Sequence, residues 1–450
     1  MGQEIPNLSA NTREYVGANA FDNDRLERRQ LAEKLTGYLE RLNDGAVLAI
    51  DAPWGEGKTW FARNWEANLK KNEYKTIYID SFEQDYVDEP FILLASELME
   101  IFKENGTAYD NKKFKKTATQ IAKSTLSIGA KVGINLATRV ILGNVDLSEE
   151  IEKSIEEGGN STADNVSKFI EDKFDNYKLE KETNVEFKKV LSDYSSKQEK
   201  PIVIFIDELD RCKPIFAVSL IERIKHYFDV PNVVFILLLN KEQLENAIKG
   251  VYGINTDASK YLDKFINFYF NLPKNNSSEY NEEIKMTNFI KMTMSKYKFG
   301  FNQDSESFIL WLNKWIPYFK LSLRDIEKCI ALYAFAFPLT IESSHLVYFI
   351  VLKVKNPKLF NALINNDLNA HKEAKEIVDR FKIESESKND STFTNIVLPR
   401  YSEWHQAHIS NFVGEIGENF RKYEINFSWG YDKKDYFKIL ANKIDIDIER

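Results

Sequence analysis

The feature that most constrains the fold of this chain is a glycine-rich loop between an apolar run and an amphipathic segment. The apolar run is Val47 to Ile50, and the loop, Ala52 to Thr59, has the sequence APWGEGKT. Apolar residues then recur at helical spacing, at Trp60, Phe61, Trp65 and Leu69. The loop fits the phosphate-binding pattern G-x-x-x-x-G-K-[ST] except at the first position, where Ala52 replaces glycine. A buried strand, this loop and a helix in that order predict the phosphate site of a nucleotide-binding domain.

Each part of the loop has a physical task. Gly55 and Gly57 let the backbone curl so that N–H groups point at phosphate oxygens, and the N-terminus of the next helix adds positive charge. Lys58 is expected to reach the β- and γ-phosphates, and Thr59 to supply a hydroxyl to Mg²⁺. We predict nucleotide contacts from Trp54, Gly55, Glu56, Gly57, Lys58, Thr59 and Trp60. A turn that contains Gly-Lys-Thr by coincidence is the alternative, and the flanking strand and helix disfavour it.

A second segment supplies the acidic groups that such a site needs. Ile202 to Ile206 is an apolar run that ends in Asp207 and Glu208. Asp207 is expected to hold Mg²⁺ through a water molecule, and Glu208 to orient and activate the attacking water. Acids often end strands, so this pattern alone is weak evidence, but together with the loop it predicts an ATPase that uses ATP and Mg²⁺.

Further short apolar runs, separated by helical patterns, predict a parallel sheet covered on both faces. They lie at 76–79, 233–239 and 268–272. The interval from Asp80 to Lys200 is far longer than one crossover requires, so it is expected to hold an inserted helical subdomain. The predicted parts are a helical lead-in (1–45), the first half of the core (46–110), the insertion (111–198), the second half of the core (199–275), a helical lid (276–355) and a C-terminal region without a motif (356–450).

Composition indicates which kinds of binding partner and which cellular compartment to expect. With 61 basic and 69 acidic side chains the formal charge is −8, which disfavours a surface built for nucleic acid. Two cysteines cannot form a disulfide framework, so a cytoplasmic location is expected. Thr125 to Gly143 is the most membrane-like stretch, but Lys131 and Arg139 would each cost about 2.5–3.5 kcal/mol near a bilayer centre. We therefore expect no membrane association.

Two segments carry a resemblance to a known family. Asp207 to Pro214, with the sequence DELDRCKP, and Pro53 to Thr59 both resemble signatures of the KAP family of P-loop NTPases. Further matches are Phe82–Tyr86, Arg223–Phe228 and Tyr261–Phe265. The resemblance covers roughly residues 20–340 and implies an α/β ATPase with sheet order 5-1-4-3-2 and a helical insertion between the second and third strands. Prokaryotic members are often associated with defence against phage, which the resemblance extends to this chain as an expectation.

Four further residues are candidates for the catalytic site. Asn240 ends the fourth strand, where it could sense the γ-phosphate, although a turn-forming asparagine explains it equally well. Arg324 resembles the lid arginine that reaches the nucleotide, with a surface arginine as the alternative. Lys264 stands where many family members have an arginine, so it is a candidate cationic finger.

Arg211 is the fourth candidate, and its role is open in the sequence. It could pair with Asp207 or Asp210, or it could point at a neighbouring subunit. His405 and His408 could lie on one helix face, but no third ligand is evident and we predict no metal site there.

The function predicted from these residues is an ATPase that acts as a nucleotide-driven switch or in assembly, with a protein partner or further copies of itself. The alternatives are a nucleotide-gated scaffold with little turnover and a nucleoside or small-molecule kinase. A DNA translocase is disfavoured by the net acidity, and DNA-stimulated turnover would revive it.

Overall fold

The computed structural model describes residues 15–22, 24–42, 44–87, 89–125, 182–272, 279–297, 303–336, 343–385, 397–410 and 436–444. The chain divides into two compact units, within residues 14–273 and 274–450. The apolar stretch after Thr125 and the acidic run around 148–159 lie outside the described residues. Within the described part, no helix has both the length and the apolar content that crossing a bilayer requires.

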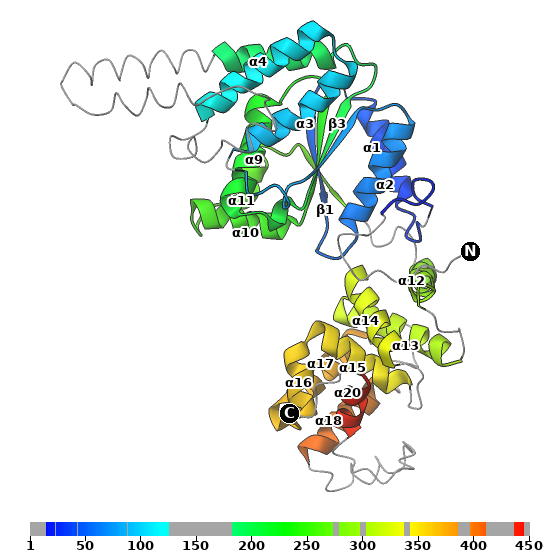
Figure 1. Ribbon diagram of the computed structural model, residues 1–450. Coiled ribbons are helices and arrows are strands. Elements are labelled where there is room, and N and C mark those ends of the chain that lie inside the picture. Colours follow the sequence, from blue (N-terminus) through cyan, green and yellow to red (C-terminus); the bar gives the residue numbers. More distant parts are fainter. Residues whose placement is uncertain are drawn as a thin grey trace, which may run out of the picture. The chain divides into compact units, whose positions relative to one another are not determined.

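The first unit is built on a parallel sheet of five strands (Figure 1). They are β1 (Ala46–Asp51), β2 (Thr76–Asp80), β3 (Ile202–Asp207), β4 (Val233–Leu239) and β5 (Phe268–Asn271). The order β2-β3-β4-β1-β5 confirms the predicted 5-1-4-3-2 arrangement. All residues of β3 and β4 are buried, as expected for central strands between two helical layers.

Helices cover both faces of this sheet (Figure 1). On one face lie α1 (Arg29–Leu39) and α2 (Lys58–Lys71), and on the other lie α3 (Pro90–Asn105), α4 (Ala108–Thr125), α9 (Pro214–Tyr227), α10 (Lys241–Tyr252) and α11 (Ala258–Leu262). Strand residues alternate between the faces. Phe205 packs its ring 5.3 Å from that of Trp65 in α2, whereas its neighbours Ile204 and Ile206 join the opposite cluster.

The described ends of the predicted insertion pack on the core. Residues 182–195 are helical, and their Phe187 ring lies 5.3 Å from Phe114 in α4 and 5.3 Å from Phe91 in α3. Phe228, which follows α9, is 5.5 Å from the same ring. Both ends are therefore part of one hydrophobic core, while the domain boundaries taken from the sequence remain predictions.

The second unit is helical in its described parts. Its helices are α12 (Glu279–Met294), α13 (Gln303–Phe319), α14 (Leu323–Ala336), α15 (Ser343–Lys355), α16 (Pro357–Ile364), α17 (Leu368–Ser385), α18 (Leu398–Ile409) and α20 (Tyr436–Ile444). Its core includes Trp315, Tyr348 and Tyr401, whose rings lie 4.6–5.5 Å from one another. The described residues of the region 356–450, where the sequence shows no motif, therefore contribute buried packing to this unit.

Candidate nucleotide site at the carboxyl ends of the strands

The predicted site residues follow three neighbouring strands of the sheet. The glycine-rich loop follows β1, Glu208 follows β3, and Asn240 follows β4, which lies between the other two. Because the strands are parallel, their carboxyl ends meet at one edge, where ligands of open α/β sheets bind. The topology therefore brings the two predicted motifs together.

The loop owes its shape to two glycines. Gly55 and Gly57 have φ angles of 84° and 77°, in the left-handed region that only glycine adopts at little cost. Gly57 directly precedes α2, so the turn aims the N-terminus of that helix at the loop. Ala52 is buried at the end of β1, and its N–H donates to the Leu239 carbonyl at 3.2 Å. A small residue fits there, which explains why alanine can stand at the first motif position.

Lys58 is the first residue of α2 and lies over the loop. Its ammonium group donates to the carbonyls of Ala52 at 2.6 Å and Pro53 at 3.3 Å. Burial lowers the pKa of Lys58, and the nearby carboxylates of Asp210 and Asp207 oppose that shift. The structure thus holds a cation where the phosphates of a nucleotide are predicted to bind.

Asp207 is joined to the loop and to the neighbouring strand. Its side chain accepts a hydrogen bond from the Tyr78 hydroxyl at 2.7 Å, and the Thr59 hydroxyl is near enough to lower the pKa of the carboxyl. The carboxylate is almost fully buried, which raises its pKa, and the two hydroxyls lower it. The hydroxyl and the carboxylate that the sequence assigns to Mg²⁺ are thus near each other, and their roles as metal ligands stay predictions.

These oxygen groups fit Mg²⁺. The ion prefers hard oxygen ligands and usually binds proteins through one or two side chains, with phosphate oxygens and water completing the shell. Thr59 supplies a hydroxyl and Asp207 a carboxylate, and Asp80 stands opposite Asp207 in the β2–β3 register. In the described part of the chain no three His, Cys, Asp or Glu side chains are arranged to hold a metal alone, and Mg²⁺ with a nucleotide does not need such a group.

Tyr78 is a site residue that no sequence pattern indicates. It lies in the middle of β2, where a tyrosine is an ordinary strand residue. The β2–β3 register pairs Tyr78 with Phe205 and Asp80 with Asp207, so the phenol reaches two pairs further along the sheet. The pairing of these strands is the signal that could have revealed it.

Glu208 is held by Arg211, three residues further along the chain. The Arg211 Nη1 atom lies 2.8 Å from Oε1 and 2.9 Å from Oε2 of Glu208. The partner is therefore Glu208 and neither Asp207 nor Asp210, the two partners considered from the sequence. Burial raises the pKa of Glu208 to about 7, and Arg211 opposes that shift. Glu208 also has a φ of 59°, a strained backbone for a residue other than glycine.

The three other loop side chains have different surroundings. Trp54 is 46% exposed, and its indole N–H donates to the Asp210 carboxylate at the rim of the site. Trp60 packs edge-on against Phe21, with the ring centres 5.7 Å apart. Glu56 is buried, with 2% of its surface exposed. Of the three, Trp54 has the surroundings of a nucleotide contact, and the roles of the other two stay predictions.

Asn240 occupies the N-cap of α10 but makes no side-chain cap hydrogen bond. The first N–H of that helix, on Lys241, instead donates to the Asp51 carboxylate at 2.8 Å. Helix capping therefore does not occupy the Asn240 amide. This favours the interpretation in which Asn240 faces the site over that of a turn-forming residue.

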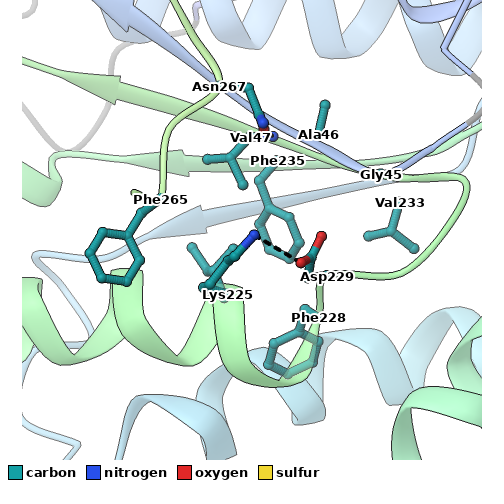
Figure 2. A pocket seen from close by; sticks show the side chains of 11 residues that line it. Gly45, Ala46, Val47, Lys225, Phe228, Asp229, Val233, Phe235, Phe265 and Asn267 are labelled. Carbon is teal, nitrogen blue, oxygen red and sulfur yellow. Dashed lines mark hydrogen bonds and ion pairs between the residues drawn. The ribbon is translucent and has the colours of Figure 1, made fainter. Parts of the chain in front are cut away.

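Lys264 lies at the opposite edge of the sheet. It precedes β5, next to the start of β1, where the Asn267 N–H donates to the Val47 carbonyl at 2.8 Å. Its ammonium group is 5.7 Å from the centre of the Tyr261 ring. Figure 2 shows a small hollow at this edge, lined by Gly45, Ala46, Val47, Ile224, Lys225, Phe228, Asp229, Val233, Phe235, Phe265 and Asn267. It contains no predicted nucleotide contact, and Lys264 cannot reach the loop of its own chain.

Arg324 is an exposed residue of α14, in the second unit. The nucleotide site lies in the first unit, so the assignment of Arg324 as a lid arginine stays a prediction.

A five-stranded parallel sheet with a phosphate-binding loop after β1 and acids after β3 defines a P-loop NTPase. The model of the KAP family P-loop domain matches residues 28–374, and the chain belongs to that family. No curated protein matches it. Similar solved structures include the ADP form of the Aeropyrum pernix ORC2 protein, at 11% identity and a TM-score of 0.33, with 97% of each chain covered. The ADPNP-ADP complexes of that protein give 11% and 0.35, with 97% of this chain and 96% of that chain covered.

Proposed function

We propose that this protein binds ATP with Mg²⁺ and hydrolyses it, and that the nucleotide state switches its interaction with a protein partner or with further copies of the chain. The observation that carries the proposal is the sheet order, which places the phosphate loop after β1 and Asp207 at the end of β3 on the same side of the sheet, with the Thr59 hydroxyl near enough to lower the pKa of Asp207. Lys58 stands on the same loop, and Glu208 directly follows Asp207. A binding cation, two metal ligands and a base thus share one edge of the sheet.

Each group has a separate task in this reaction. The loop N–H groups and Lys58 bind the phosphates, while Thr59 and Asp207 hold the ion that neutralises charge between the β- and γ-phosphates. Glu208 orients the attacking water and accepts its proton. A carboxylate suited to activating water favours hydrolysis over transfer of the phosphate to another molecule. A kinase, the alternative, would release ADP only when a phosphate acceptor is added, whereas hydrolysis needs only water.

Three single variants test these tasks. Lys58→Ala should weaken ATP binding as well as turnover, because the ammonium touches the phosphates before the reaction begins. Glu208→Gln keeps the size and removes the base, so turnover should fall by roughly 10²–10⁴ with little change in ATP affinity. Asp207→Ala should resemble Lys58→Ala, since losing the metal contact disturbs both binding and reaction.

The measurements are ATP affinity by calorimetry and phosphate release without an added acceptor. Wild-type turnover in Glu208→Gln would refute the assignment of the base and make Asp210 the next residue to test. Wild-type affinity in Lys58→Ala would refute the phosphate-loop assignment.

The ion pair between Glu208 and Arg211 favours a second candidate, a nucleotide-gated scaffold with little turnover. A base tied to a guanidinium must leave it before it can orient water. In that case ATP should bind tightly while phosphate release stays near background. A single-turnover measurement with excess protein separates the two candidates, because slow chemistry appears there independently of product release.

A further inference from the structure

Arg28 is a buried arginine at the phosphate loop that no motif points to. It directly precedes α1, only 1% of its surface is exposed, and its Nη1 donates to the Gly57 carbonyl at 3.4 Å. Among the described residues, its Nε and Nη2 atoms have no hydrogen-bond partner. A buried guanidinium with unused donors is costly, so its position requires an explanation.

Helix stability does not explain it. Arg28 stands at the N-cap of α1, where Ser, Thr, Asp and Asn are the favoured residues, and it makes no side-chain cap bond. A cation at this end also opposes the helix dipole. Glu27, just before it, has a φ of 55°, which is strained for a residue with a side chain. Unfavourable capping, charge and backbone conformation of this kind are expected where a residue is kept for a functional site.

The segment that carries Arg28 is fixed to the helix that carries Lys58. The N–H of Phe21 donates to Asn64 Oδ1 at 2.7 Å, and Asn64 Nδ2 donates to the Tyr15 carbonyl at 2.8 Å. Trp60 packs against Phe21 on the same side of α2. These contacts hold the chain before α1 against α2, so that Arg28 lies next to Gly57 of the loop.

The loop itself supplies the charge that Arg28 balances. Glu56 lies within the loop and is also buried, with 2% of its surface exposed. Burial lowers the pKa of Arg28 to about 10, and the attraction of Glu56 and then Asp24 opposes that shift. A buried carboxylate beside a phosphate site repels the nucleotide unless a cation compensates it, because charge interactions are strong away from water.

We propose that Arg28 is a positioning residue of the nucleotide site, whose buried guanidinium balances the charge of Glu56 and holds the turn at Gly57 in the shape that receives phosphates. The inference rests on the proposed nucleotide binding and assigns a new residue to it. It also gives Trp60 a task, since that side chain anchors the segment carrying Arg28.

If Arg28 offsets the charge of Glu56, substitutions at the two residues should change nucleotide affinity in opposite directions. Arg28→Met removes a positive charge that offsets Glu56, so the Kd for Mg²⁺-ADP should rise about tenfold, and that for Mg²⁺-ADPNP should rise more because it carries one more negative charge. Glu56→Gln removes the repelling charge, so both affinities should tighten. Arg28→Lys keeps the charge and should lose less than about threefold, and Arg28→Met combined with Glu56→Gln should recover most of the loss.

Arg29→Met is the matched control. Arg29 is the next residue, is largely exposed, and pairs with Glu33 at 2.8 Å, so nucleotide binding should not change. The affinities are measured by calorimetry, and thermal unfolding of each variant shows whether it is folded. If Arg28→Met fails to fold, Arg28→Lys and Glu56→Gln still decide the sign.

Two results would overturn the inference while leaving nucleotide binding intact. One is wild-type affinity in folded Arg28→Met. The other is equal weakening by Arg28→Met and Glu56→Gln with no recovery in the double variant, which would reduce the arginine to a tie between α1 and the loop. If the wild-type protein binds neither nucleotide, the proposed function fails together with this inference.

Discussion

Tyr78 supports the carboxylate that is proposed to hold Mg²⁺. Its hydroxyl donates to Asp207 Oδ2 at 2.7 Å, and the guanidinium of Arg63 lies 3.4 Å from the centre of its ring. The ring is therefore fixed on one face while its hydroxyl orients the carboxylate. Partners of this kind typically change metal affinity 10–100-fold when removed.

Tyr78→Phe should therefore raise the Mg²⁺ concentration that gives half-maximal turnover by roughly tenfold or more. It should also lower the free energy of unfolding by about 1–3 kcal/mol, because a buried acceptor loses its donor. Tyr74→Phe is the control, since the Tyr74 hydroxyl donates to Glu40 at 2.9 Å in a comparable pair outside the site. Its stability should fall while its Mg²⁺ requirement stays unchanged. An equal Mg²⁺ requirement in the two variants would contradict this role for Tyr78.

Among the individual site residues, the sequence predicts those that belong to short motifs. The loop with Lys58 and Thr59 and the Asp207-Glu208 pair are local patterns, and the fold brings them together as the parallel topology requires. Arg28 and Tyr78 reach the site through contacts with residues 29 and 129 positions away. Such contacts depend on tertiary packing, for which one sequence has no periodic signal.

Among the elements, the turn into β1 depends on a glycine. A Cβ atom at Gly45 would lie 2.3 Å from the Val230 carbonyl oxygen, a backbone atom that cannot move aside alone. Gly45→Ala should therefore destabilise the first unit by about 1–3 kcal/mol through overpacking. Denaturant unfolding of the purified protein measures the effect.

At two glycines within helices, unlike at Gly45, substitution by alanine should increase stability. A methyl group added at Gly37 in α1 or at Gly250 in α10 would meet no atom of another element within 4 Å, so alanine fits at both positions. Gly37→Ala and Gly250→Ala should each stabilise by about 0.4–1 kcal/mol. A loss of stability at these positions as large as that at Gly45 would show that the close contact is not the cause.

The strands were predictable because continuous apolar runs are typical of buried parallel strands, and β4 has the predicted bounds. Boundaries that depend on neighbouring groups were less accurate. The helix after the loop was expected from Trp60 but begins at Lys58, since the turn at Gly57 already starts it, and β3 extends to Asp207, which pairs with Asp80 in β2. Residues 356–450 have no motif because packing helices require only apolar spacing.

For the molecule as a whole, a cluster of three buried histidines, two of which have lowered pKa values, makes the second unit sensitive to acid. His371, His405 and His408 are buried between α17 and α18, with Nδ1 of His371 3.1 Å from Nδ1 of His405 and the rings of His371 and His408 stacked at 4.1 Å. Burial lowers the pKa of His371 to about 4, which Asp367 opposes. Burial, the other two histidines and Lys375 lower that of His405.

An unfolded histidine has a pKa near 6.5, so the unfolded state binds more protons between about pH 6.5 and 4, and stability falls as the pH drops through that window. For a pKa of about 4 the loss is about 2 kcal/mol at pH 5. Hydrogen exchange, corrected for its intrinsic pH dependence, should show α17 and α18 opening in acid before β3 and β4. His405→Gln should flatten this dependence, whereas His226→Gln, at an exposed position of α9, should not. Identical acid profiles for the two variants would contradict the prediction.

The position of Lys264 has a consequence for assembly, because this cation and the phosphate loop lie at opposite edges of one sheet. If Lys264 serves a neighbouring copy, turnover per chain should fall on dilution, and Lys264→Ala should be nearly inactive. Mixing it in equal amounts with Glu208→Gln should restore about a quarter of wild-type turnover, the share of contacts that combine an intact base with an intact lysine. Constant turnover on dilution together with full activity of Lys264→Ala would remove the idea.

If the copies stack head to tail, a contact of that kind gives the assembly a direction. Each copy then donates a charge from one end of its sheet and receives one at the other, so one interface supplies only one of the two sites. Successive copies close into a ring if the rotation between them permits, and otherwise form an open filament. In a ring every site receives its lysine, whereas in a filament the copy at one end always lacks a donor. Activity per chain in a filament would therefore increase with its length, and the smallest fully active species would be the closed ring.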